Sequence, residues 1–443
     1  MSKVEAVIFD LDNTLVNTTA LNDFRTNTPS QAPSFELLAK TKIYPQVHTM
    51  LQAILDKGIK LGLVTNSTRD YANAVLQYHD IHKYFGSIIT YNDVIPDGHK
   101  PSPVGIQKAI QQLKVGSKVI YVGDDAVDFN AAYAAHIKPV APSWASTLPI
   151  KQIPAAMLSS SYLIDELDNY ENIKLLAESV ARNAVFTPPG KRFYFMPMLL
   201  NGDVGALRKE KIEAVSLGRY FSQGDPLTAY LHNKHALSQE IYKKELSSTY
   251  VIPEYFVDLM VFYINKAPVY FYNDQNAKFD LITVIPSKKG KNPRLENLLN
   301  RIAKKVDNKD ALFITDLFYF EDDAVSLKTL GGIAARDNQI KDKLRFKNKY
   351  SGHIQGKRVL VIDDVVTTGA TLRGAYNLLN ELQPQRIFSV CFAKTVNIKS
   401  VDKVCPECHR RMRVRKNRKD GSQFWGCSGF FEADKCTYTE DIT

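Results

Sequence analysis

The chain is short of cysteine and tryptophan and has no long apolar run. Five cysteines and two tryptophans among 443 residues are too few for a disulfide scaffold. Apolar stretches are interrupted by charge or proline, as at Lys266 and Pro268, and the first residues carry charges. These absences argue against a signal peptide, a membrane span and a secreted disulfide-linked protein, so we expect a cytoplasmic protein.

What the chain does have is length and an uneven charge. A chain of 443 residues exceeds one typical core, so two or three domains are expected, and 44% apolar with 23% charged residues is ordinary for a globular protein. The net charge is +10, and between Lys403 and Lys419 eight basic side chains stand against one acid, Glu407. A polyanionic partner would therefore meet the carboxyl-terminal segment.

Polar side chains follow apolar strands in the first third of the chain. The strand expected at residues 4–9 leads to Asp10 and Asp12, which we expect on one face because they are two positions apart. One carboxylate can attack phosphorus, and the other can give a proton to the leaving oxygen and later activate water. Thr65, after a second strand, can bind the phosphoryl group, and Lys100 supplies a positive charge.

A further apolar strand, expected at residues 119–122, leads into Asp124 and Asp128. Their carboxylates suit a Mg²⁺ site. Together with Asp10 and Asp12 they would crowd negative charge, which a divalent cation between them makes tolerable. We therefore expect Mg²⁺ at these four acids.

This order of motifs resembles the haloacid dehalogenase (HAD) superfamily over roughly residues 1–175. The resemblance implies that Asp10 becomes an aspartyl phosphate, that Asp12 is the general acid/base, and that Thr65 and Lys100 bind phosphate. An acid at position 12 distinguishes the phosphatases of that superfamily from its dehalogenases. The alternative is a structural domain with four unrelated polar groups at strand ends.

A second cluster follows an apolar strand expected at residues 359–362. Paired carboxylates at the tip of a strand can accept hydrogen bonds from ribose hydroxyls, and a hydroxyl- and glycine-rich turn before a helix can face a phosphate. The residues concerned are Asp363, Asp364, Thr367, Thr368, Gly369, Ala370 and Thr371. This pattern resembles the phosphoribosyl-pyrophosphate (PRPP) signature of type I phosphoribosyltransferases, most nearly the ComF family, over about residues 279–396.

Phosphoribosyl transfer also needs groups that carry pyrophosphate. The lysine-rich loop at residues 285–291 is a candidate. Within the ComF-like resemblance, Arg336, Gln339 and Arg345 fall in a mobile loop over the site. For each of these basic residues taken singly, solvated surface charge is an equally good reading.

Four cysteines crowd into the last 39 residues, at Cys405, Cys408, Cys427 and Cys436. Four thiolates suit tetrahedral Zn²⁺ with no open position, so we expect a structural zinc that stabilises a segment too small to fold alone. Cys391 lies in an apolar strand and is expected in the core.

Basic and aromatic residues surround these cysteines. They are Arg410, Arg411, Arg413, Arg415, Lys416, Arg418, Lys419, Phe424, Trp425, Phe430 and Phe431. Cations that follow phosphates and rings that stack on bases suit single-stranded nucleic acid, and the segment is similar to the carboxyl-terminal zinc ribbons of type IA topoisomerases. Alternatively, the rings form the ribbon's core and the cations balance the metal site.

The sequence thus predicts an α/β protein with a HAD Rossmann-like parallel-sheet domain with a small cap (1–175), a ComF-like phosphoribosyltransferase domain (186–397) and a four-cysteine zinc ribbon (402–443). We expect a Mg²⁺-dependent phosphatase that acts on nucleotides or nucleic-acid ends and binds PRPP. The alternatives are a nucleic-acid-binding regulator that senses PRPP or a nucleotide, and a bifunctional enzyme that makes a modified nucleoside.

Overall fold

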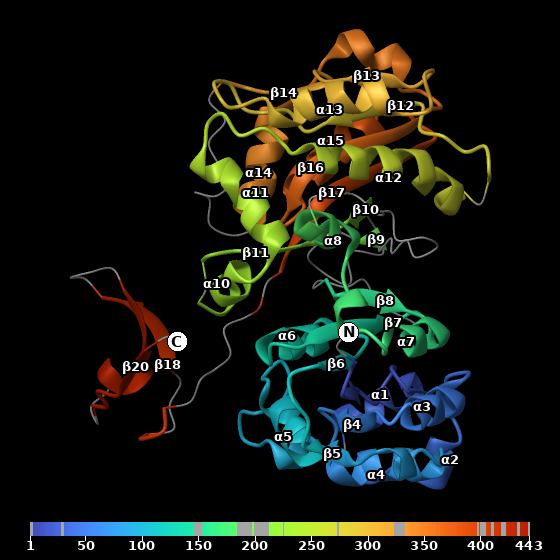
Figure 1. Cartoon of the computed structure of the whole chain (residues 1–443), viewed down its shortest axis with the longest axis vertical. Helices are drawn as coiled ribbons and strands as arrows, with labels where there is room; N and C mark the ends of the chain where they lie inside the picture. Colours follow the sequence, from blue (N-terminus) through green and yellow to red (C-terminus); the bar gives the residue numbers. More distant parts are fainter. Residues whose placement is uncertain are drawn as a thin grey trace.

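The structure is a computed structural model. It describes residues 3–27, 31–145, 153–183, 197–198, 212–224, 226–272, 274–322, 333–396, 398, 405–408, 412–417, 422–431 and 435–441. The described segments form two large α/β units and a small three-stranded sheet (Figure 1). Residues 187–190, Thr-Pro-Pro-Gly, predict a linker and lie outside these ranges. In the described ranges every helix is too short or too polar to cross a bilayer.

The first unit is built on a six-stranded sheet in which all neighbouring strands are parallel. Its strands, in spatial order, are β5 (Ser87–Ile89), β4 (Lys60–Val64), β1 (Ala6–Phe9), β6 (Val119–Val122), β7 (Lys138–Pro142) and β8 (Ala156–Leu158). The helices around it are α3 (Val47–Asp56), α4 (Arg69–Tyr78), α5 (Val104–Leu113), α6 (Ala126–Ala134) and α7 (Ser160–Glu166).

Strand β1 lies inside the sheet and is covered by helices on both faces. Its side chains alternate between two covered faces: Val7 and Phe9 pack in the core with α3, α4 and α7, and Ala6 and Ile8 pack with α5 and α6. Because both faces are buried, the strand is apolar throughout, as expected for a parallel sheet. Its carboxyl end, where Asp10 begins, lies between the ends of β4 and β6.

A small insertion follows the first acids. Strands β2 (Val16–Asn17) and β3 (Lys42–Ile43) pair in an antiparallel manner. Between them lie a 3₁₀ turn and two short helices, α1 (Asn22–Asn27) and α2 (Phe35–Leu38). The insertion predicted to be small is therefore built from single turns in the residues that the structure describes.

The second unit contains a seven-stranded, mostly parallel sheet. Its strands are β13 (Leu312–Ile314), β12 (Leu281–Val284), β16 (Arg358–Val366), β17 (Arg386–Val396), β10 (Glu213–Ser216), β9 (Pro197–Met198) and β11 (Arg219–Phe221). The helices are α8 (Leu176–Asn183), α10 (Pro226–Asn233), α11 (Ala236–Leu246), α12 (Glu254–Tyr272), α13 (Arg294–Lys305), α14 (Ile333–Lys343) and α15 (Ala370–Asn380), and β14 (Phe318–Phe320) pairs with β15 (Leu344–Phe346).

Each face of this sheet has its own helical layer. Leu360 and Ile362 of β16 pack with α12 and α13, whereas Val359 and Val361 pack with α14 and α15. Cys391 of β17 is fully buried, as expected of a core cysteine. Helix α8 packs into the core of this second unit, because its apolar residues contact α11 and α12.

Three elements differ from the sequence expectations. Strand β16 continues to Val366, so Asp363 and Asp364 lie within it and not at its tip. The sequence pattern predicts one helix over residues 164–182, but the structure has two separate helices there, α7 and α8. Arg336 and Gln339, expected in a mobile loop, lie in helix α14, where Ile340 anchors the helix in the core beside α15.

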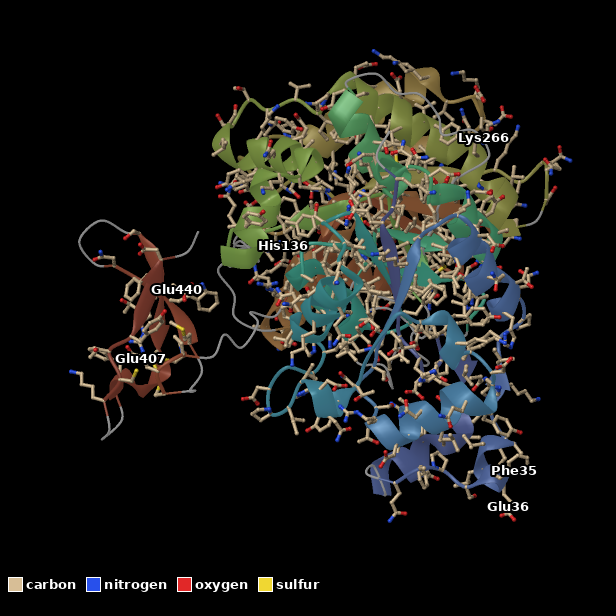
Figure 2. All side chains as sticks on the ribbon, turned by 60° about the horizontal axis from the view of Figure 1, so that its bottom comes forward. Phe35, Glu36, His136, Lys266, Glu407 and Glu440 are labelled. Atoms are coloured by element: carbon tan, nitrogen blue, oxygen red, sulfur yellow. The ribbon has the colours of Figure 1, made fainter. Side chains whose placement is uncertain are left out.

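The two units meet beside a buried ion pair of the second unit. Arg219 of β11 donates to both carboxylate oxygens of Glu178 on α8, and its Nη1 donates to the Tyr133 hydroxyl of α6 at 3.2 Å. His136, just after α6, lies beside Tyr230 of α10 with ring centroids 4.6 Å apart, and Figure 2 places it where the two units meet. Although burial opposes it, Arg219 holds the pKa of Glu178 well below its ordinary value.

We predict that this ion pair contributes strongly to the stability of the second unit, next to the junction. Arg219→Met would leave Glu178 buried without its main partner and should lower the free energy of unfolding by about 3–5 kcal/mol. Arg386→Met is the matched control, because its pair with Glu213 is about one third exposed and should cost only about 0–1 kcal/mol. Urea unfolding followed by circular dichroism measures both, and equal losses would contradict the prediction.

Candidate functional site

Three acids of the first unit form a buried group at the carboxyl edge of its sheet. Asp10 follows β1, and Asp124 and Asp128 follow β6, and all three are at least 92% buried. One carboxylate oxygen from each lies within 4.8 Å of the other two. Gly123 is required here, because a Cβ at that position would lie 2.5 Å from Cγ of Asp128.

Lys100 places its ammonium group among these acids. Its Nζ lies 2.5 Å from Oδ1 of Asp10 and 2.6 Å from Oδ1 of Asp128. The side chain of Asn66 fixes the Lys100 backbone, donating to its carbonyl at 3.0 Å and accepting from its N–H at 2.8 Å. Burial alone would lower the pKa of Lys100, but Asp10 and Asp128 raise it well above its ordinary value.

Burial and mutual repulsion disfavour the charged form of these carboxyl groups. Burial raises the pKa of Asp10 well above its ordinary value, with Lys100 opposing and Asp128, Asp124 and Asp12 adding to the rise. Burial and the Asp128 charge also raise the pKa of Asp124 to about 7. Three buried oxygen donors with one ammonium group are suited to Mg²⁺, which binds carboxylate oxygens and offsets their repulsion. Asp10, Asp124 and Asp128 would hold it.

Asp12 lies outside this three-acid group. Its Oδ1 accepts hydrogen bonds from the Thr18 hydroxyl at 2.7 Å and the Tyr71 hydroxyl at 2.8 Å, and its Oδ2 accepts from Ser67 at 2.7 Å. Arg25 of α1 approaches Oδ1 at 3.5 Å. The side chain is thus oriented by hydroxyl donors, as a proton-transfer group must be, and not by the acids expected to share a cation with it.

The structure places Thr65 at the same carboxyl edge of the sheet. It follows β4, is 97% buried, and its hydroxyl oxygen accepts from the Ser67 N–H at 3.1 Å. Sequence reasoning missed the residues that orient this set, namely Ser67, Tyr71, Arg25 and Tyr121. Ser67, two positions after Thr65, could have been found from its place at the strand end, whereas the others carry no local signal.

In the second unit the paired acids occupy successive positions near the end of β16. The regular alternation of faces does not hold through this part of the strand. Leu360 and Ile362 pack on the face of α12 and α13, and so does Val365, whereas Val361 and Val366 pack on the other face. Strand alternation therefore does not decide how the two carboxylates lie relative to each other.

Asp364 is engaged by two cations. Its Oδ2 lies 2.9 Å from Nζ of Lys244 and 2.8 Å from Nε of Arg294. Although burial opposes them, these cations hold the pKa of Asp364 well below its ordinary value. A ribose hydroxyl would have to share or replace these contacts.

The hydroxyl-rich loop after β16 keeps the predicted form. Gly369 has φ of +81° and precedes α15, a conformation that favours glycine. The hydroxyls of Thr367 and Thr395 lie 2.7 Å apart, and the buried ammonium of Lys394 donates to the Thr367 carbonyl. Burial lowers the pKa of Lys394 to about 8. Thr368, Ala370 and Thr371 complete the turn into the helix.

The carboxyl-terminal sheet gathers the four cysteines. It consists of β18 (Met412–Lys416), β19 (Gln423–Cys427) and β20 (Thr439–Asp441), all antiparallel. Sγ atoms of Cys405 and Cys436 lie 3.7 Å apart and those of Cys408 and Cys427 lie 3.3 Å apart. All four ligand atoms lie within 4.8 Å of one another, a donor set that fits tetrahedral Zn²⁺.

The ribbon's aromatic residues divide between core and surface. Trp425 packs against the cysteine group, whereas Phe430 is 41% exposed. Arg415 and Lys435 lie over the Phe430 ring, at 5.7 and 4.5 Å from its centroid. Four of the predicted basic residues, Arg410, Arg411, Arg418 and Lys419, lie outside the described residues, as do the side chains of Arg413, Lys416 and Phe431.

Two family models match separate parts of the chain. Residues 31–141 match the haloacid dehalogenase-like hydrolase model, which includes Thr65, Lys100, Asp124 and Asp128 but not Asp10 and Asp12. Residues 291–421 match the phosphoribosyl transferase domain model, which includes the loop at 363–371. The chain therefore has a parallel-sheet HAD-like domain and a second α/β domain that matches phosphoribosyltransferases.

Several curated relatives match part of the chain. A putative pyrophosphatase PpaX of Caldanaerobacter subterraneus is 33% identical over 112 residues, covering 25% of this chain and 50% of the relative. Pyrophosphatase PpaX of Oceanobacillus iheyensis is 25% identical and covers 32% of this chain and 84% of the relative. Phosphoglycolate phosphatase of Aquifex aeolicus is 31% identical and covers 29% and 61%. The chain thus spans half the length of the first of these relatives.

Solved structures give weaker similarities. A putative haloacid dehalogenase-like hydrolase from Bacteroides fragilis is 22% identical, with 33% of this chain and 90% of that chain covered and a TM-score of 0.27. A HAD-superfamily hydrolase from Geobacter sulfurreducens is 18% identical, with 37% and 100% covered and a TM-score of 0.31. At these scores the fold assignment rests on the sheet order and the family models.

Asp363 offers a pH-dependent test of the second site. Burial and the adjacent Asp364 raise the pKa of Asp363 to about 7, so the folded protein loses stability as this acid ionises between about pH 4 and pH 7. We expect Asp363→Asn to raise the melting temperature by an amount that grows from pH 5 to pH 7 and then levels off. Asp168→Asn, at an exposed carboxylate, should show no such trend, and a pH-independent gain for Asp363→Asn would contradict the prediction.

Proposed function

We propose that the protein is a Mg²⁺-dependent phosphatase that forms an aspartyl phosphate at Asp10. The observation that carries this proposal is the buried group of Asp10, Asp124 and Asp128 with the Lys100 ammonium among them. The match to HAD-like hydrolases and the phosphatase relatives support it.

The chemistry divides between two differently held acids. A carboxylate oxygen of Asp10 attacks phosphorus, and the phosphoryl oxygens meet Lys100 and the Thr65 hydroxyl. Asp12, held by Thr18, Ser67 and Tyr71, gives a proton to the leaving oxygen and then takes one from the water that releases phosphate. Bound Mg²⁺ would neutralise charge on the acids and the phosphoryl group.

The substrate we propose is a nucleotide or the phosphorylated end of a nucleic acid. The described part of the insertion between β2 and β3 contributes only short turns, so it does not supply a separate lid domain. The loop at residues 363–371 supports binding of PRPP or a related ribose phosphate in the second unit, through the α15 N-terminus and the Thr hydroxyls. A ribose hydroxyl that binds Asp364 would share or replace the contacts of this carboxylate with Lys244 and Arg294.

We predict that Asp10→Asn reduces phosphate release by on the order of a thousandfold or more, because the nucleophile is lost. The variant should melt at the same temperature as the wild type or higher, since one buried charge is removed. The assay would follow phosphate from nucleotides, 3'- and 5'-phosphorylated oligonucleotides, pyrophosphate and phosphoglycolate, with Asp168→Asn as the control. A wild-type protein inactive on the whole panel with Mg²⁺, or an active Asp10→Asn variant, would refute the phosphatase proposal.

We further propose that the ribbon holds Zn²⁺ and contacts single-stranded nucleic acid. Four convergent cysteines support the metal, and the exposed Phe430 ring, with Arg415 and Lys435 near it, supports stacking on a base beside a phosphate. A ribbon whose rings all formed its core would lack this surface.

This proposal predicts one zinc ion per chain, and a loss of oligonucleotide affinity when a chelator removes it. Phe430→Ala should weaken binding of a single-stranded oligonucleotide about tenfold, whereas Phe35→Ala should not. Phe35 is the matched control because it is an exposed ring on α2, far from the ribbon in Figure 2. An affinity that changes when PRPP is added, without pyrophosphate release, would favour the regulator. No binding at low salt would overturn nucleic-acid contact and favour the bifunctional nucleoside-forming enzyme.

A further inference from the structure

Tyr121 reaches the phosphatase site from inside the sheet. It is the third residue of β6 and is fully buried on the face that also carries Ile8 and Val64, under α5 and α6. Its hydroxyl lies at the carboxyl edge of the sheet, 2.9 Å from Nζ of Lys100 and 2.8 Å from the Val64 carbonyl oxygen. No motif in the sequence assigns this residue a role.

Each hydrogen-bond donor of Lys100 and of the Tyr121 hydroxyl has one acceptor. An ammonium group has three N–H donors, and Lys100 has three acceptors within 3 Å: Asp10 Oδ1, Asp128 Oδ1 and the Tyr121 oxygen. Tyrosine has a single O–H donor, and its nearest acceptor is the Val64 carbonyl, since Asp128 Oδ1 is 3.4 Å away. The phenol therefore accepts from Lys100 and donates to Val64.

These hydrogen bonds fix the orientation of the Tyr121 hydroxyl group. By donating to Val64, which precedes Thr65, Tyr121 turns its lone pairs toward the ammonium. Without that third acceptor, a buried N–H of Lys100 would lack a partner, and the two acids alone would set the ammonium position.

We propose that Tyr121 is a positioning residue of the phosphatase that acts through Lys100. The proposal rests on the phosphatase function proposed above. The hydroxyl holds the Lys100 ammonium at the carboxyl edge of the sheet, where Lys100 and Thr65 meet the phosphoryl group. It thereby links the Lys100 loop to β4 and β6. A structural role in packing would instead belong to the ring, which lies 5.5 Å from Nζ of Lys100 and which phenylalanine would retain.

The test is a double-mutant cycle on the full chain with Mg²⁺. Tyr121→Phe removes only the hydroxyl and should lower kcat/KM by about 10- to 100-fold, the range for a hydrogen bond to a charged group. In a Lys100→Ala background the same substitution should change kcat/KM less than twofold, because its target is gone. Where Lys100→Ala leaves too little turnover, the affinity for orthovanadate, measured by calorimetry, supplies the same cycle.

Tyr133→Phe is the matched control, because it also removes a buried hydroxyl, which donates to the Ile153 carbonyl at 2.6 Å, away from the acids. It should leave kcat/KM within about twofold of wild type. An equal loss from Tyr121→Phe in both backgrounds, or no loss in either, would overturn the positioning role. A wild-type protein that releases no phosphate from any compound would instead refute the phosphatase function, so the two failures are distinct.

Discussion

The arrangement of the first unit depends on concentrating buried carboxylates around a single ammonium group. Parallel strands β1 and β6 end side by side, which forces Asp10 and Asp124 together, and the start of α6 adds Asp128. Burial makes their charges costly, and Lys100 offsets only part of the cost. These buried oxygens suit a divalent cation, as proposed above, because its charge would offset their repulsion and that of an anionic phosphoryl group.

Sequence order predicted this edge because strand ends can be read from apolar runs. The end of each parallel strand must appear at the same edge, so Asp10, Thr65 and Asp124 meet without any knowledge of loops. What could not be predicted is what orients them. In the sequence, Tyr121 looks like one more apolar position of β6, and Tyr71 looks like a core residue of α4. In the structure, the Tyr121 hydroxyl accepts a hydrogen bond from Lys100, and the Tyr71 hydroxyl donates one to Asp12.

Strand boundaries differ from those expected at both sets of paired acids. Strand β1 ends at Phe9, so Asp10 and Asp12 lie in the loop beyond it, where Asp12 has its own hydroxyl partners. Asp363 and Asp364 were expected at a strand tip, but β16 runs on to Val366 and contains both. Apolar patterning locates the end of a strand only to within a few residues, and it carries no signal for the hydroxyl groups and cations that bind these acids.

The junction between the two α/β units brings their candidate sites into one folded body. Helix α6 begins at the acid group and ends near Tyr133, whose hydroxyl contacts Arg219 of the second sheet. Arg219 pairs in register with Lys394 on β17, and Lys394 donates to the Thr367 carbonyl of the predicted ribose-phosphate loop. Each polar group in this series of buried contacts has a specific partner that costs energy to lose. The two units are therefore joined at this junction by packed apolar side chains and by the hydrogen bond from Arg219 to Tyr133.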